Sequence, residues 1–269
     1  MKPISEKKHT SIFSKTDTTH LVQRGANLGQ TSKQIEGDAH LADVVLYNER
    51  LLLVIERFGI PLGFGDKTIA EICSYYELNT SLVLMVMNIF VNPSSHTKEE
   101  LTEEMLPEFI DYLKRGHRYY LDEKLPYISE LIDRFIEHTD NPDTKLLQAF
   151  FKGYAREVNE HMQLEDATVF PYIQALHHLL KEMPYNKRLL QYSMDDFVKH
   201  HSDIEEKLED LTQLLIKHFP PTKDRFYRNT ILFELFALHY DLNDHGRIEE
   251  QILVPLVRQL EKRKAKDAE

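Results

Sequence analysis

Two stretches of the sequence share a pattern from which the fold can be predicted. Residues 161–171 read HMQLEDATVFP, and residues 245–255 read HGRIEEQILVP. Each stretch places a histidine four residues before a glutamate, with a proline six residues after that glutamate. In an α-helix, side chains four residues apart lie on the same face, one turn from each other. The sequence therefore predicts two helices whose faces each present a histidine and a glutamate together.

Residues 100–262 show the period of long amphipathic helices on both sides of these stretches. Apolar residues recur at i, i+3 and i+4, and the pattern is interrupted only near Pro142, Pro184 and Pro220. Three breaks separate four helices with short connections, so we predict an all-α, up-down-up-down four-helix bundle. The predicted apolar stripes include Leu121 in the first helix and Phe150 in the second.

One histidine interrupts each of the four apolar stripes. These histidines are 17 to 21 residues from the same end of the predicted bundle, which is about 26–32 Å at about 1.5 Å per residue. Two of the stripes also hold a glutamate, and none holds a lysine or arginine to pair with it. Because a buried carboxylate without a partner is strongly destabilising, the set predicts a metal site. Its candidate ligands are His117, His161, Glu165, His201, His245 and Glu249.

The donor types indicate which metal such a site holds. Four imidazoles and two carboxylates, without a thiolate, suit non-haem iron or manganese. A single tetrahedral zinc ion would leave two of the six groups unused. Two iron ions (Fe2+/Fe3+) bridged by Glu165 and Glu249, with two histidines each, use all six. With an oxo or hydroxo bridge, each iron would keep an open position for O2 or NO.

Three further polar residues are candidates for positions just behind the ligands. Glu157 precedes His161 by one turn and is a candidate for guiding protons or ligand entry. His200 adjoins His201, and only the phase of the apolar stripe favours His201 as the ligand. Glu205 follows His201 by one turn, although a solvated helix face explains it more simply.

His138 also extends the stripe of the first helix, but we do not assign it to the site. About 31 Å of helix separate it from His117, unless Pro126 breaks that helix. A histidine favoured by the helix dipole at a helix C-terminus is the simpler interpretation.

The chain before the bundle divides into two parts. Residues 1–36 are polar and lack periodicity, so we predict a mobile arm. Residues 40–92 predict a small helical domain with helices at 42–58, 68–76 and 81–91. The second and third of these resemble a helix-turn-helix, but residues 40–91 hold three basic against six acidic side chains. A packing or dimerisation module is therefore favoured over a DNA-binding one.

Composition excludes several classes of protein. A formal net charge of −11 disfavours binding to nucleic acid or an anionic membrane. The single cysteine, Cys73, rules out an internal disulfide framework. Because neither a signal peptide nor a membrane-spanning segment is evident, we expect a cytoplasmic protein.

The same residues also resemble those of a known family. Residues 100–262 resemble the hemerythrin-like domain, and roughly residues 50–260 resemble the iron–sulfur cluster repair di-iron proteins, the repair of iron centres family. The resemblance rests on the two stretches quoted above, on His117 in Arg-Gly-His, and on His201 in His-His-Ser-Asp. Members of that family carry a Cys-Cys pair where this chain reads Pro61–Lys67 without a cysteine, and Cys73 occupies the place of a cysteine on their following helix.

The resemblance implies defence against nitrosative or oxidative damage, with NO or O2 as ligand and iron–sulfur proteins as partners. It leaves open whether the centre turns over, for example as an NO-reducing or cluster-repair enzyme, and whether the chain forms a homodimer. Three alternatives remain: a non-catalytic O2, NO or iron sensor, a DNA-binding regulator, and a metal-free structural bundle.

Overall fold

The computed structural model describes residues 34–92, 102–139, 143–200, 204–219 and 225–267. The chain splits into two compact units, Met1–His96 and Thr97–Glu269, and each is considered by itself. Within the described residues the secondary structure is helical, and the only β-type pairing is an isolated bridge between His40 and Thr68. The predicted arm lies outside the described residues up to position 33. Ile35 is buried, so the folded unit begins earlier than predicted.

In residues 34–92 the first unit contains four helices: α2 (Leu41–Tyr47), α3 (Leu51–Arg57), α4 (Ile69–Tyr75) and α5 (Thr80–Val91). Thr68 caps α4 through a reciprocal capping box with Glu71, in which each side chain bonds the other residue's backbone N–H, at 3.2 and 2.8 Å. Asn88 interrupts the apolar sequence of α5. Its side-chain amide bonds the backbone N–H and carbonyl of Ile35 at 2.6 and 3.0 Å, so this buried polar group holds the segment before α2 in place.

The prediction of one helix over 42–58 is wrong. The chain turns between α2 and α3 at Asn48, whose backbone is extended. The Asn48 side-chain oxygen accepts a hydrogen bond from the backbone N–H of Arg50 at 3.1 Å. Asparagine readily forms such local bonds, which compete with continuation of a helix.

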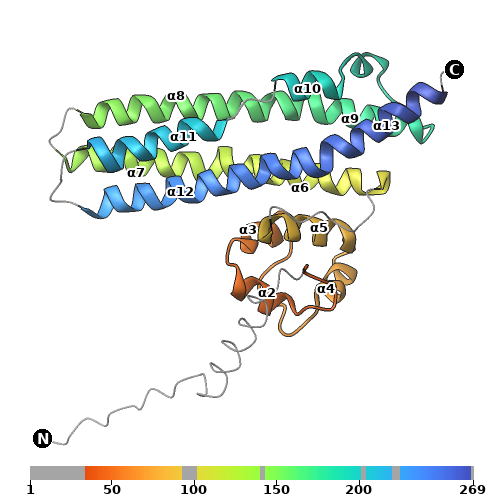
Figure 1. Ribbon diagram of the computed structural model, residues 1–269, viewed down its shortest axis with the longest axis horizontal. Helices are drawn as coiled ribbons and strands as arrows, with labels where there is room; N and C mark the ends of the chain where they lie inside the picture. The colour runs from red at the N-terminus through yellow and green to blue at the C-terminus, as the bar shows by residue number, and fades with distance from the viewer. Residues whose placement is uncertain (1–33, 93–101, 140–142, 201–203, 220–224, 268–269) are drawn as a thin grey trace, which may run out of the picture. The chain divides into compact units, whose positions relative to one another are not determined.

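The second unit is a bundle of four long helices (Figure 1). The first consists of α6 (Leu106–Arg118), a π turn (Tyr119–Lys124) and α7 (Leu125–Glu137), preceded by a short 3-10 turn (Glu103–Met105). The second consists of α8 (Asp143–Leu164), a π turn (Glu165–Val169) and α9 (Phe170–Leu180). Pro126 does not break the first helix, because α7 continues directly from the π turn.

The third part of the bundle follows a 3-10 turn (Lys187–Gln191) and contains α10 (Met194–His200), α11 (Ile204–Gln213) and a π turn (Leu214–His218), with positions 201–203 outside the described residues. The fourth consists of α12 (Arg225–Ile248), a π turn (Glu249–Leu253) and α13 (Val254–Asp267). Helix α7 packs on α8 and α12, and α11 packs on the same two helices. Each long helix thus neighbours the ones before and after it, and the predicted all-α up-down-up-down bundle is confirmed.

The core of the bundle follows the predicted stripes with two corrections. On the fourth helix all the predicted positions are buried, from Ile231 to Leu256. On the second helix Phe151 is buried while Phe150 is exposed. On the first helix Tyr120 is fully buried and Leu121 only packs against the core from its edge. None of the described helices is at once long enough and apolar enough to span a membrane.

Candidate metal centre

The candidate ligands lie where three of the long helices change from α to π geometry. His117 is in the last turn of α6, His161 in the last turn of α8, and His245 in the last turn of α12. Glu165 and Glu249 are the first residues of the π turns that follow α8 and α12. The four-residue spacing therefore still places each histidine beside its glutamate, and the helix widens directly afterwards.

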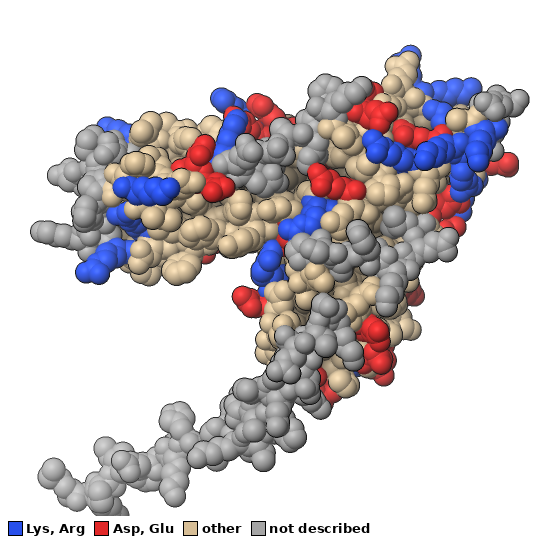
Figure 2. All heavy atoms as spheres, viewed as in Figure 1, with Lys and Arg blue, Asp and Glu red and all other residues tan. Residues whose placement is uncertain are grey.

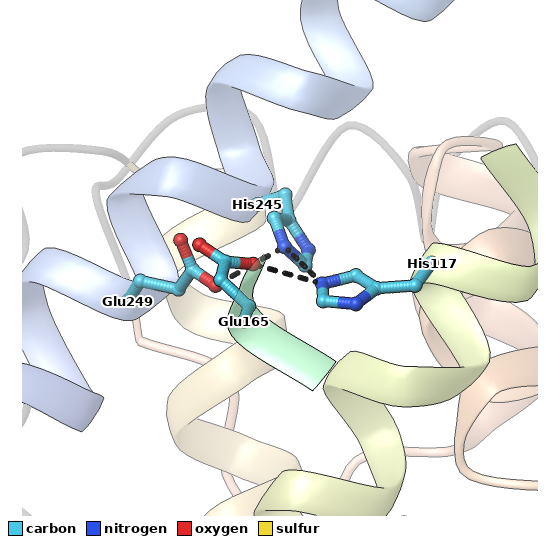
Figure 3. Close-up of side chains that lie close together, drawn as sticks. All are labelled: His117, Glu165, His245 and Glu249. Atoms are coloured by element: carbon cyan, nitrogen blue, oxygen red, sulfur yellow. Dashed lines mark hydrogen bonds and ion pairs between the residues drawn. The ribbon is translucent and has the colours of Figure 1, made fainter. Parts of the chain in front are cut away.

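Four of these side chains converge inside the bundle (Figure 3). One ligand atom from each of His117, Glu165, His245 and Glu249 lies within 4.8 Å of all the others. The Nε2 atoms of the two histidines are 3.2 Å apart, and Nε2 of His245 is 3.2 Å from Oε1 of Glu249. All four residues are at most 2% exposed, so the centre is shielded from bulk solvent.

Glu165 faces two histidines, one with each oxygen. Its Oε2 is 3.2 Å from Nε2 of His117, and its Oε1 is 3.1 Å from Nε2 of His161. His161 approaches from the same helix as Glu165, whereas His117 belongs to the neighbouring helix. The carboxylate therefore lies between two imidazoles.

The buried polar atoms of this centre fit a cation better than they fit each other. Within the described part of the chain, neither oxygen of Glu165 has a hydrogen bond of acceptable geometry, although both are close to imidazole nitrogens. Buried polar groups are normally satisfied, so an orphaned buried carboxylate needs an explanation. Its oxygens and the nearby Nε2 atoms face a common point, which suits coordination of a metal ion by N and O donors.

Electrostatics in the chain without metal also favour a positive charge at this point. Burial by itself lowers the pKa of His117, but Asp166 and Glu165 outweigh burial and raise it to about 9. Burial and the carboxylate of Glu249 raise the pKa of Glu165, but His117 and His161 outweigh them and lower it overall. Glu165 therefore favours its ionised form beside these imidazoles.

Neighbouring side chains fix the two buried rings. Nδ1 of His117 donates to Oδ1 of Asp166 at 3.1 Å, which leaves Nε2 directed at the centre. The same ring stacks on Phe170 at 5.4 Å between centroids. Tyr120 meets the ring of His245 edge-on at 5.7 Å, and its hydroxyl donates to the carbonyl of Asp241.

The sequence did not identify Asp166 or Tyr120 as parts of this centre. Asp166 directly follows Glu165, but an acidic residue beside another is common on solvated faces. Tyr120 is fully buried, and its contact with His245 depends on the π turn that contains it. No pattern in the sequence distinguishes these two roles.

The remaining candidates do not join the converged group in the described structure. His201 lies outside the described residues, and the side chains of His200 and Glu205 are likewise not described. Glu157 pairs with Lys207 on α11 at 2.5 Å and is partly exposed. His138 is the C-cap residue of α7, with Nδ1 at 2.8 Å from the carbonyl oxygen of Arg134, as expected for a histidine at a helix C-terminus.

Comparison with known proteins agrees with this geometry. Residues 108–257 match the hemerythrin HHE cation binding domain, which is more than half of the 269 residues. The chain therefore belongs to the hemerythrin HHE cation binding domain family. It is also similar to the iron-sulfur cluster repair protein ScdA of Staphylococcus haemolyticus (strain JCSC1435), with 22% identity over 205 residues. That match covers 74% of this chain and 89% of the relative. Both parts of the resemblance predicted from the sequence are thus confirmed.

Proposed function

We propose that this chain is a non-haem di-iron protein that binds NO or O2 and protects or repairs iron–sulfur clusters under nitrosative or oxidative stress. The observation that carries the proposal is the buried convergence of His117, Glu165, His245 and Glu249. Two carboxylates and two imidazoles in an apolar bundle form an N/O donor set for iron. Membership of a cation-binding family supports the same interpretation.

The two oxygens of Glu165 favour two ions over one. His117 and His245 approach each other on one side of this carboxylate, and His161 lies at its other oxygen. His117, His161, Glu165, His245 and Glu249 would hold the ions, and the two oxygens of Glu165 would allow it to serve both. His201, which lies outside the described residues, would be the sixth ligand.

Two such ions would supply one-electron redox chemistry and open coordination positions for a diatomic gas. The chain's own residues prepare the place for them. Asp166 holds the tautomer of His117 that presents Nε2 inward, and the packing of Phe170 and Tyr120 against the imidazoles keeps water from the centre.

The cellular role is proposed from the relative. The ScdA protein is named for iron–sulfur cluster repair, and this chain matches most of its length. We propose the same class of role here, in the cytoplasm, with NO or O2 as gas ligand and iron–sulfur proteins as partners. A gas sensor of hemerythrin type would use the same ligands without turnover.

The first test is the iron content of the anaerobically purified full chain, with its optical spectrum. We expect about two irons per chain and charge-transfer bands of an oxygen-bridged diferric pair, because six N/O donors match two ions. The double variant His245→Ala/Glu249→Ala should lose both signals. The matched control, His138→Ala/Glu160→Ala, changes the same residue types at exposed positions and should retain them.

Absence of iron after anaerobic reconstitution, with wild type and double variant alike, would refute the di-iron centre. If iron is bound, the consumption of NO by the reduced protein distinguishes turnover from sensing. Multiple turnovers support an enzyme, and a single stoichiometric binding event supports a sensor.

A further inference from the structure

The outer face of α12 has an unusual composition for this bundle. Its exposed residues between positions 226 and 243 are Phe226, Asn229, Phe233, Phe236, Ala237, Tyr240 and Asn243. The four aromatic side chains are 69%, 73%, 38% and 52% exposed, in chain order. They recur at helical spacing, so they form one stripe, here called the α12 aromatic stripe.

None of the exposed residues between positions 226 and 243 is charged, although Arg225, just before Phe226, is exposed and Glu234 is partly exposed. Arg228 turns back to bond the carbonyl of Leu215, Glu234 pairs with Lys124 on the first helix, and Asp241 is buried. The outer face of α8 in the same bundle instead exposes Lys145, Lys152, Arg156 and Glu160. The α12 aromatic stripe therefore combines the two features that distinguish interface cores from ordinary surface, depletion of charge and enrichment in aromatic residues.

The stripe is large enough to matter for binding. At about 200 Å² for a fully exposed aromatic side chain, its four rings leave roughly 450 Å² accessible. The largest exposed apolar patch on a monomer is commonly about 300–600 Å² and is often functional. A standard interface buries about 800 Å² on each partner, so the rings provide about half, and Asn229, Ala237 and Asn243 extend the area. Figure 2 shows a mostly tan area over α12, with few charged side chains.

We propose that the α12 aromatic stripe is the interface between two copies of this chain, packed antiparallel about a two-fold axis. Each copy carries a net charge of −11, so two copies repel each other except across an uncharged face. An isologous dimer places the same patch of both subunits in contact. This proposal does not depend on iron binding.

The spacing of the stripe suits that symmetry. With the axis between positions 234 and 235, Phe233 meets Phe236 of the partner subunit at the centre. Asn229 meets Tyr240 of the partner subunit on either side, which gives the tyrosine hydroxyl an amide to bond. Every pairing is aromatic or polar without charge, and antiparallel α12 helices also oppose their dipoles favourably.

Sedimentation equilibrium of the full chain over a range of concentrations tests the proposal. We expect a reversible dimer for the wild type. Phe233→Glu should raise its dissociation constant at least about 30-fold, since it places a charge in the centre of the interface. Leu146→Glu is the matched control, because Leu146 is 60% exposed on α8, away from the stripe, and its replacement should leave the dimer unchanged.

A cross-linking experiment tests the orientation without relying on a destabilised variant. In a Cys73→Ala background, Asn229→Cys/Tyr240→Cys should form dimers through disulfides, and either single substitution should not. A wild type that stays monomeric throughout refutes the proposal, as does a dimer that Phe233→Glu and Leu146→Glu affect equally. A dimer cross-linked by the single variants would refute the antiparallel arrangement.

Discussion

At the scale of single residues, Asp166 lies beside the candidate centre and contacts one of its imidazoles, that of His117. Asp166 is about two-fifths exposed, yet its carboxylate is 3.1 Å from Nδ1 of His117. The other buried ring, His245, has no hydrogen-bond partner at Nδ1 among the described residues. One imidazole is therefore held by a carboxylate and the other chiefly by packing.

Asp166→Ala should weaken iron binding about 10- to 100-fold, because outer carboxylates orient an imidazole ligand and raise its basicity. Asp166→Asn keeps an acceptor oxygen without the charge, and we expect it to fall between wild type and Asp166→Ala. Competition with a chelator of known affinity measures these constants, and circular dichroism measures helix content, which should not change.

The control for this series is Glu160→Ala, which removes an exposed carboxylate from the same helix. Equal losses of affinity in Glu160→Ala and Asp166→Ala would show that only the overall negative charge matters. Unchanged affinity in Asp166→Ala would remove Asp166 from any positioning role.

At the scale of elements, the π turns explain how prolines are accommodated in continuous helices. The turns at 119–124, 165–169 and 249–253 are each followed, two residues later, by Pro126, Pro171 and Pro255. At the second of these, the N–H of Phe170 bonds the carbonyl of Glu165, five residues back instead of four. The wider turn changes the hydrogen-bonding register just where a proline would otherwise lose a bond and clash with the preceding turn.

Pro171→Ala should therefore change the free energy of unfolding by less than about 1 kcal/mol, since proline is well tolerated in a first helical turn. Lys152→Pro is the matched comparison in the uninterrupted part of α8. It is exposed, so the change acts mainly on the backbone, and it should cost about 3 kcal/mol or more. Urea unfolding measures both values. A large loss of stability in Pro171→Ala would contradict this interpretation of the π turn.

At the scale of the whole molecule, the candidate metal ligands all belong to one of the two compact units. The candidate centre lies in Thr97–Glu269, and Met1–His96 has its own core with Leu51, Val54 and Met85 fully buried. A ligand that binds only the folded state of one unit stabilises that unit by mass action. The first unit should gain nothing directly.

Scanning calorimetry of the full chain should accordingly resolve a transition that depends on iron and one that does not. Free iron at about 1,000 times its dissociation constant adds about 4 kcal/mol to the bundle, which raises its midpoint by about 10 °C for a unit of this size. Chelation should reverse this shift alone. An equal shift of both midpoint temperatures would show that the two units unfold together.

The bundle and the four candidate ligands that converge in it could be predicted from the sequence, because the relevant information is local. Apolar residues at i, i+3 and i+4 mark the buried face of a helix whatever its neighbours are, and the stripe of the fourth helix is buried throughout. A histidine and a glutamate four residues apart must share a face. Counting residues from a common end also placed His117 at the level of His245, and their Nε2 atoms are 3.2 Å apart.

Features that depend on a change of helical register or on a contact with another helix could be seen only in the tertiary structure. The π turn at 119–124 brings Tyr120 rather than Leu121 into the core, because five residues rather than four then separate Tyr120 from the next buried apolar residue, Leu125. Phe151 rather than Phe150 faces the core of the second helix. The contact of Asp166 with His117 spans 49 residues of sequence, and only the packing of two helices creates it.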